Sequence, residues 1–262
     1  MLQSYSRYES DAVAAVYLEA EWSDMLFSSN PGVSGLPFDP MTTRAAPSFY
    51  KKIADIAALS CRDLLLNPRH ICDVGSATGR TIYELIQRFD SIREAIAVEP
   101  ALLLHQWSRR LLVDPPSHLN IPVVDAWNSP NEKVVNGSVI ARPRQLEFVT
   151  FLNSPIERLD QSVRNLDLIV CCNLLDRHPE PHNLVDMLWS RLRPGGLLVL
   201  ASPLEFGIET ADIPRKAVTD IGAFLTESYW RVLSVSEELY DLRLYSRKWV
   251  RYVSQVVVTT RR

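Results

Sequence analysis

A glycine-spaced turn between a strand pattern and a helix pattern is the feature that most constrains the fold of this chain. Residues 71–74 read Ile-Cys-Asp-Val, and Gly75 and Gly79 follow with three residues between them. Apolar residues at helical spacing begin soon after Gly79. Glycines let the backbone approach a ligand closely and take positive φ, and the helix start beyond them offers free N–H groups. The segment therefore indicates a site for a nucleotide-type cofactor.

The spacing of this turn separates three kinds of nucleotide site. A P-loop needs four residues between its glycines and then Lys-Ser/Thr, whereas here three intervene and Arg80-Thr81 follows. A dinucleotide fingerprint needs a second glycine where this chain has Ala77, whose methyl group would obstruct a pyrophosphate. A P-loop is excluded, and a nicotinamide-dependent oxidoreductase stays as a weaker alternative.

A second short strand pattern, residues 95–98, ends in Glu99 about 20 residues beyond the glycines. In cofactor sites of this kind an acid at that position binds the ribose hydroxyls, so Glu99 is the ribose candidate. The alternative is a surface glutamate at a strand end. For Asp73 the alternative to a role in the site is an ordinary turn acid or helix cap.

Composition limits the class of protein and its partners. With 262 residues, 47% hydrophobic and 23% charged, the chain can form one sizeable core, or one core with an accessory cap. The net charge of −3 and the lack of a basic run argue against nucleic acid and against an anionic membrane surface as partners. The start has no apolar leader and no apolar run reaches membrane-spanning length, so we expect a cytoplasmic location.

The order of patterns along the chain predicts an α/β fold with a cap. Residues 1–66 hold helix patterns and a Pro/Gly/Ser-rich connection, and we expect an N-terminal helical cap. From 67 to 262 strand and helix patterns alternate, which predicts a mostly parallel twisted sheet with helices on both faces. The polar stretch 121–146 reads as an insertion, with a hairpin as one form. The four cysteines lie in apolar patterns without C-x-x-C spacing, which favours reduced, buried thiols.

A later strand pattern, residues 166–172, is also expected to end at the cofactor site. Residues 166–172 are a continuous apolar run, typical of a strand buried on both faces, and the polar loop 173–179 follows it. A helix pattern then leads to Arg-Pro-Gly-Gly at 193–196, where the proline ends the helix and the glycines turn the chain into another strand.

The turn Asp73-x-Gly75-x-x-x-Gly79 resembles the first motif of class I S-adenosylmethionine-dependent methyltransferases, which have a Rossmann-like fold. The runs 173–177 and 193–203 resemble, more narrowly, the methyltransferase domain of ovothiol biosynthesis enzymes. Three shorter matches extend this likeness over nearly the whole chain: Tyr8-Glu9-Ser10-Asp11, Gly79-Arg80 with Tyr83-Glu84-Leu85, and Ser246-Arg247-Lys248.

The resemblance implies transfer of a methyl group from S-adenosylmethionine, with S-adenosylhomocysteine as product, to a ring nitrogen of a small sulfur- or selenium-bearing histidine. That acceptor would come from an iron-dependent sulfoxide or selenoxide synthase, which we expect as a separate partner. The synthase's metal motif is His-x-x-x-His-x-Glu, whereas the segment from His178 to His182 has two prolines between its histidines and no final acid. We therefore predict no metal site in this chain.

The same resemblance yields two sets of site residues. The expected cofactor-binding residues are Asp73, Gly75, Ser76, Gly79, Arg80, Glu99, Pro100, Asn153, Ser154 and Asn173. The expected substrate-binding residues are Tyr8, Glu9, Asn173, Asp176, Arg177, Arg247 and Lys248.

For catalysis, a carboxylate near the imidazole could orient the ring and accept its proton. Asp176 is the first candidate for this base and His178 the second. The structural alternatives are that Asp176 caps the loop or pairs with Arg177 there, and that His178 is a solvated loop residue without a role in catalysis.

Three departures from the family pattern leave the choice of acceptor open. Ser76 replaces a cysteine, Pro155 stands where an acid near the adenine is usual, and residues 204–206 are Leu-Glu-Phe in place of Tyr-Thr-Trp. Two alternatives therefore stay open: a methyltransferase for another small N, O or S nucleophile, and a non-catalytic protein that binds S-adenosylmethionine.

Overall fold

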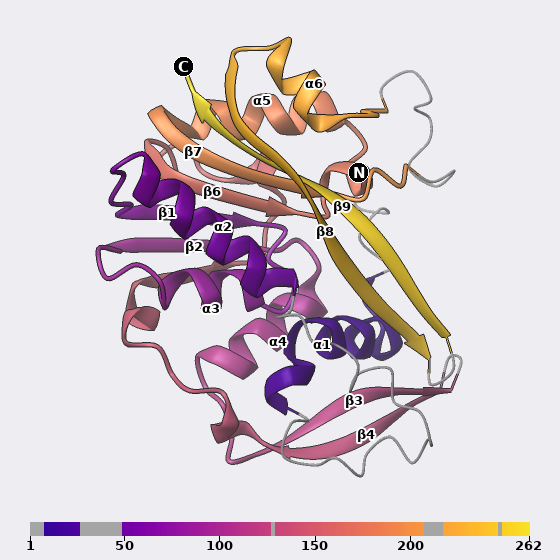
Figure 1. The fold of residues 1–262 in the computed structure, drawn as a ribbon. Helices are drawn as coiled ribbons and strands as arrows, with labels where there is room; N and C mark the ends of the chain where they lie inside the picture. Colours follow the sequence, from indigo (N-terminus) through magenta and orange to yellow (C-terminus); the bar gives the residue numbers. More distant parts are fainter. Residues whose placement is uncertain (1–7, 27–48, 127–128, 207–216, 246–247) are drawn as a thin grey trace.

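The computed structural model describes residues 8–26, 49–126, 129–206, 217–245 and 248–262. Its centre is a seven-stranded sheet with the order β5-β2-β1-β6-β7-β9-β8 (Figure 1). The strands are β1 (His70–Val74), β2 (Glu94–Val98), β5 (Val149–Leu152), β6 (Leu166–Cys172), β7 (Leu192–Ser202), β8 (Trp230–Tyr245) and β9 (Lys248–Arg261). The first five are parallel, whereas β9 runs antiparallel to β7 and to β8. The predicted mostly parallel α/β sheet is confirmed.

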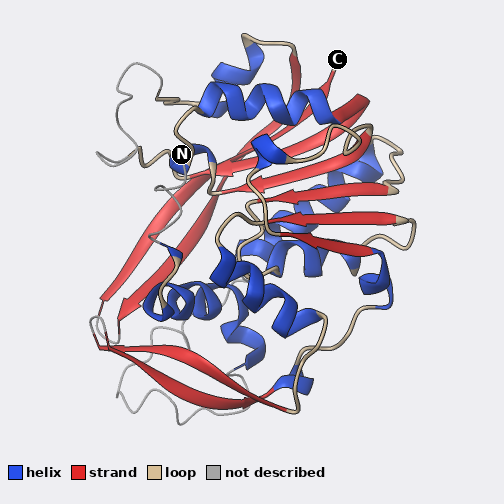
Figure 2. Ribbon diagram, turned by 180° about the vertical axis from the view of Figure 1, so that it is seen from behind, coloured by secondary structure: helices blue, strands red, loops and turns tan. Residues whose placement is uncertain are grey.

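Six α-helices lie in the described segments: α1 (Asp11–Leu26), α2 (Phe49–Asp63), α3 (Arg80–Ile86), α4 (Leu102–Leu112), α5 (Pro181–Arg191) and α6 (Ile221–Thr226). They cover both faces of the sheet, as Figure 2 shows from behind. Side chains of α2, α3 and α4 pack on one face, and those of α5 and α6 pack on the other. The fold therefore has the three layers that parallel strands require.

Alternation along β6 shows how the sequence produces these layers. All seven of its residues are buried. Leu168 and Val170 face the core under α2 and α3, whereas Ile169 and Cys171 face the core under α5. A strand between two helical layers has no polar face, which is why this run is apolar throughout.

The strand order places a crevice beside β1. From β1 the chain moves to β2 and β5 on one side, and it then returns to β6 and β7 on the other side. In open α/β sheets ligands bind where the order reverses, at the carboxyl ends of the strands. We therefore expect the ligand site at the carboxyl ends of β1, β2 and β6.

Two further elements surround that edge of the sheet. Strands β3 (His118–Ala126) and β4 (Ser129–Asn136) form a separate antiparallel hairpin that begins just before the predicted insertion, residues 121–146, and overlaps it. Helix α1 packs against this hairpin and against β8, near the far end of the long β8–β9 ribbon (Figure 1). No helix in the described ranges is long and apolar enough to cross a membrane.

Candidate functional site

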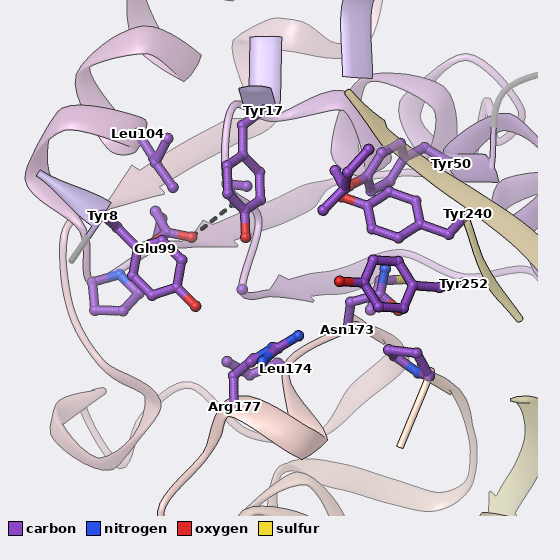
Figure 3. Close-up of a pocket in the computed structure, with 16 residues that line it drawn as sticks. Tyr8, Tyr17, Tyr50, Glu99, Leu104, Asn173, Leu174, Arg177, Tyr240 and Tyr252 are labelled. Atoms are coloured by element: carbon purple, nitrogen blue, oxygen red, sulfur yellow. Dashed lines mark hydrogen bonds between the residues drawn. The ribbon is translucent and has the colours of Figure 1, made fainter. Parts of the chain in front are cut away.

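A pocket opens at the carboxyl ends of β1, β2 and β6 (Figure 3). Six of the residues proposed from the sequence line it: Tyr8, Gly75, Glu99, Pro100, Asn173 and Arg177. Its other lining residues are Tyr17, Tyr50, Ala77, Leu104, Cys172, Leu174, Pro203, Tyr240, Leu242 and Tyr252. The pocket thus combines the glycine turn with groups from α1, α2 and the β8–β9 ribbon.

The glycine turn is tight because both of its glycines have positive φ. Gly75 has φ +78° and Gly79 has φ +91°. A Cβ on Gly79 would lie 3.0 Å from Leu112 Cδ1, and one on Gly75 would lie 3.2 Å from Leu174 Cδ2. A larger residue would therefore strain the turn at either position, and at Gly79 its Cβ would press on Leu112 of α4.

Glu99 ties the turn to the start of α4. Its Oε2 accepts a hydrogen bond from Ala77 N–H (2.9 Å) and its Oε1 accepts one from Ala101 N–H (2.8 Å). Burial raises the pKa of the Glu99 carboxyl to about 7, although both N–H groups favour the charged form. Each oxygen keeps a second lone pair, so the carboxylate can still accept ligand hydroxyls.

Asp73 is buried behind the turn and is not among the pocket-lining residues of the described chain. Its Oδ2 accepts a hydrogen bond from Ile82 N–H in the first turn of α3 (3.1 Å). Burial, and then the nearby Glu21 and Glu99, hold the pKa of this carboxyl well above its usual range. Asp73 therefore fixes the turn from behind.

Asn173 presents an unused donor at the end of β6. Its backbone has φ +52°, its N–H donates to Ala201 O (2.7 Å), and its Oδ1 accepts from Ser254 Oγ (3.1 Å). The buried Nδ2 has no hydrogen-bond partner among the described residues. Because the amide oxygen is anchored, the amide N–H groups lie at the pocket end of β6 without an acceptor from the described residues.

Tyrosines form the end of the pocket opposite Glu99 (Figure 3). The Tyr50 hydroxyl donates to the Tyr240 hydroxyl (3.3 Å), and the rings of Tyr240 and Tyr252 stack with centroids 6.2 Å apart. Burial raises the pKa of all three phenols, so they are neutral at physiological pH. Sequence reasoning missed these tyrosines because they come from α2, β8 and β9.

Arg177 is the cation among the described residues that line the pocket. Its Nη2 donates to Glu205 Oε2 (2.7 Å), and its Nε lies 3.3 Å from Asp176 Oδ2. Asp176 is completely buried, its Oδ1 accepts from Ser202 Oγ (2.6 Å), and burial raises its pKa. Among the described residues Asp176 does not line the pocket, so its visible role is to hold Arg177.

His178, the second candidate base, is also turned away from the pocket lining that the structure describes. Its Nε2 lies 3.0 Å from Glu157 Oε1, and its Nδ1 accepts from Glu180 N–H (3.1 Å). With 3% of the side chain exposed, the ring fastens the loop after β6 to the neighbouring 3₁₀ turn.

Arg80 is enclosed by acids and not directed at the pocket. Its guanidinium is 1% exposed, donates twice to Asp24 (2.6 and 2.8 Å) and once to Glu84 (2.8 Å), and reaches the Glu21 carbonyl (2.6 Å). Arg80 therefore binds helix α1 to the glycine turn.

Other proposed residues stand around the pocket and not in its described lining. Glu9 caps α4 by accepting from Leu102 N–H (2.6 Å) and Leu103 N–H (2.9 Å). Asn153 donates to the carbonyls of Glu99 (3.0 Å) and Pro100 (3.1 Å) and so supports the pocket wall.

The last residues proposed from the sequence are placed as follows. Ser76 is buried, and its N–H donates to Val98 O (3.0 Å). Ser154 Oγ donates to Pro155 O (3.0 Å). Lys248 is exposed at the start of β9, and Arg247 lies outside the described residues.

Comparison with known proteins gives a family and a fold. A family model described as a methyltransferase domain matches residues 45–249. Magnesium protoporphyrin IX methyltransferase from Synechocystis PCC 6803, solved with bound SAM, is similar with a TM-score of 0.51 and 12% identity, over 97% of this chain and 98% of that chain. An S-adenosylmethionine-dependent O-methyltransferase from Thermotoga maritima is similar with a TM-score of 0.49 and 17% sequence identity. The match covers 85% of this chain and 69% of that chain. No curated protein sequence matches the chain.

Proposed function

The chain belongs to the methyltransferase domain family, and on this premise we propose that it methylates a ring nitrogen of a small imidazole acceptor, a sulfur- or selenium-bearing histidine first of all. Its donor is S-adenosylmethionine, which supplies the methyl group as an electrophilic sulfonium. An iron-dependent sulfoxide or selenoxide synthase is the partner that we propose as the source of the acceptor.

The residues at the glycine turn fit this donor. We assign the ribose hydroxyls to the Glu99 carboxylate, because each of its oxygens keeps a second lone pair and the residue lines the pocket. The adenine would lie against Pro100 and Leu104, which are apolar and line the same end of the pocket. In the family pattern an acid near the adenine is usual at the position of Pro155. In this chain we propose that apolar contacts with the adenine replace that acid.

The tyrosine end of the pocket, where we place the acceptor, supports an acceptor with a planar ring. Tyr50, Tyr240 and Tyr252 provide aromatic faces and neutral hydroxyls beside the free amide of Asn173. Aromatic faces stack on planar rings and attract positive charge, which develops on the acceptor during transfer. An uncharged ring nitrogen suits this wall better than a carboxylate does.

The chain contributes mainly orientation to the reaction. The nitrogen lone pair forms the N–CH₃ bond while the C–S bond breaks, the bonding electrons go to sulfur, and the positive charge passes to the ring. The second ring nitrogen keeps its proton during this step and loses it to water later, so no base has to act at the moment of transfer. Most of the rate enhancement then comes from holding the ring nitrogen close to the methyl carbon and in line with the C–S bond. We therefore propose that Asp176 acts through Arg177, as a positioning residue.

A panel of acceptors with methyl-labelled donor tests the proposed acceptor. Thiohistidine, selenohistidine, histidine, a catechol and a simple thiol would be compared at equal concentration, and the position of the label would be found by NMR. We expect label on a ring nitrogen of the sulfur or selenium compounds. Turnover of the catechol or the thiol alone would overturn the imidazole proposal. Donor binding without transfer to any acceptor would instead favour the non-catalytic alternative.

The raised pKa of Glu99 predicts proton release when S-adenosylhomocysteine binds. Near pH 6 the buried carboxyl is largely protonated, because its pKa is about 7, whereas ribose hydroxyls favour the charged form. Binding therefore releases about one proton from Glu99, and affinity rises as the pH approaches 7. Calorimetry in buffers of different ionisation enthalpy measures this number. We expect Glu99→Gln to release about one proton fewer, and equal release by both proteins would contradict the assignment.

A further inference from the structure

Glu21 of helix α1 is a buried carboxyl that the assignments above leave unused. It is 1% exposed. Its Oε2 accepts from the hydroxyl of Thr78 and from the N–H of Arg80 (3.3 Å), both at the glycine turn. Its Oε1 is buried and has no hydrogen-bond partner among the described residues.

Glu21 is not among the described residues that line the pocket, but its carboxyl lies next to residues that do. Thr78, which binds it, directly follows Ala77 of the pocket lining. Tyr17 precedes Glu21 by one turn on α1 and lines the pocket as well. The charge of Glu21 also acts on the ionisation of Tyr50, Tyr240 and Cys172, which line the pocket from three other elements.

No cationic side chain in the described segments donates a hydrogen bond to this carboxyl. The guanidinium of Arg80 reaches the backbone carbonyl of Glu21, while its other bonds go to Asp24 and Glu84. The acids Asp73 and Glu99 also lie close enough for their charges to act on that of Glu21. Burial raises the pKa of Glu21 to about 8, so the group holds a proton in this setting unless a cation meets it and favours the carboxylate.

We propose that Glu21 Oε1 binds the α-ammonium group of the methyl donor. The inference rests on the donor site of the proposed function and not on the identity of the acceptor. The donor's amino-acid arm carries the one permanent cation, apart from the sulfonium, that a methyltransferase pocket receives each cycle. Glu99 and Glu21 would then fix the donor at two points on either side of the glycine turn.

The test compares two ligands that differ in the ammonium group alone: S-adenosylhomocysteine and its desamino analogue. Binding to the full chain is measured by calorimetry. In the wild-type protein we expect the desamino analogue to bind about tenfold more weakly, since a hydrogen bond between two charged groups is lost. In Glu21→Gln the two ligands should bind with equal affinity, because the selective contact is gone.

Asp24→Asn is the matched control, since Asp24 lies on the same helix and contacts the same turn through Arg80. It should keep the preference for S-adenosylhomocysteine even if it weakens both ligands. Should Glu21→Gln unfold, Glu21→Asp, with its shorter carboxylate, is expected to lose most of the preference. A preference that survives in the Glu21 variants, or is missing in the wild type, overturns the proposal. Failure of the wild type to bind either ligand would instead count against the donor site itself.

Discussion

Replacement of Glu99 by alanine is expected to weaken binding of S-adenosylhomocysteine roughly 100-fold, which corresponds to about 2.7 kcal/mol. The variant loses the acceptor of the ribose hydroxyls and also releases the N–H groups of Ala77 and Ala101, which the carboxylate holds in place. The Michaelis constant for the acceptor, measured at saturating donor, should change less than about threefold, because the acceptor carries no ribose.

Glu94→Ala is the control for this experiment. Glu94 begins the same strand β2 but is exposed at the opposite edge of the sheet. Calorimetry should give the wild-type affinity for this variant. Equal losses for donor and acceptor in Glu99→Ala, or a normal donor affinity, would remove Glu99 from the proposed ribose site.

The second large effect concerns stability. Arg80→Met should destabilise the protein by about 3 kcal/mol, because the buried Glu84 carboxylate loses one of its two arginine partners and keeps only Arg88. For a chain of this size that loss lowers the melting temperature by roughly 10 °C. It also detaches helix α1 from the glycine turn, since the bonds from Arg80 to Asp24 and to the Glu21 carbonyl are lost as well.

Arg251→Met is the control at an exposed arginine. Arg251 makes a comparable two-bond pair with Asp241 (2.8 and 3.0 Å), but its side chain is 62% exposed. Exposed pairs contribute about 0–1 kcal/mol, so this variant should melt close to the wild type. Differential scanning calorimetry at neutral pH compares the two variants. Melting temperatures within about 2 °C of each other would show that the Arg80 pair does not act as a buried one.

The donor half of the pocket could be predicted from the sequence because local conformation determines it. Positive φ at Gly75 and Gly79 is a local property that glycine tolerates, and it leaves a recognisable spacing. The apolar strands before Asp73 and Glu99 are equally local patterns. Together these features gave the parallel sheet, the family and the part of the pocket that contains Gly75, Glu99 and Pro100.

The acceptor half could not be read in this way. Tyr50 and Tyr240 are hydrogen-bonded but lie 190 residues apart in the chain. No local pattern brings them together, since the meeting depends on how α2 packs on the β8–β9 ribbon. Long-range packing of this kind is what a single sequence does not display.

The direction of the side chains of Asp176 and His178, in the loop after β6, could not be predicted from the sequence. Asp176 and His178 follow a strand end, where ligands bind, and so were natural candidates for a base. In the structure Ser202 and Arg177 surround Asp176, while Glu157 and Glu180 hold the ring of His178. Residue type and position do not tell which way a side chain turns, so their catalytic roles stay predictions for mutagenesis to test.

The place of β9 in the sheet has a consequence for synthesis of the protein. Although it follows β8 in the chain, β9 lies between β7 and β8, and its residues 255–260 pair with β7. A nascent chain on the ribosome therefore cannot join β8 to the rest of the sheet until β9 has emerged from the exit tunnel. Tyr252, on the same strand, arrives with it. A stalled translation product that lacks β9 would hold the complete glycine turn but no finished acceptor wall.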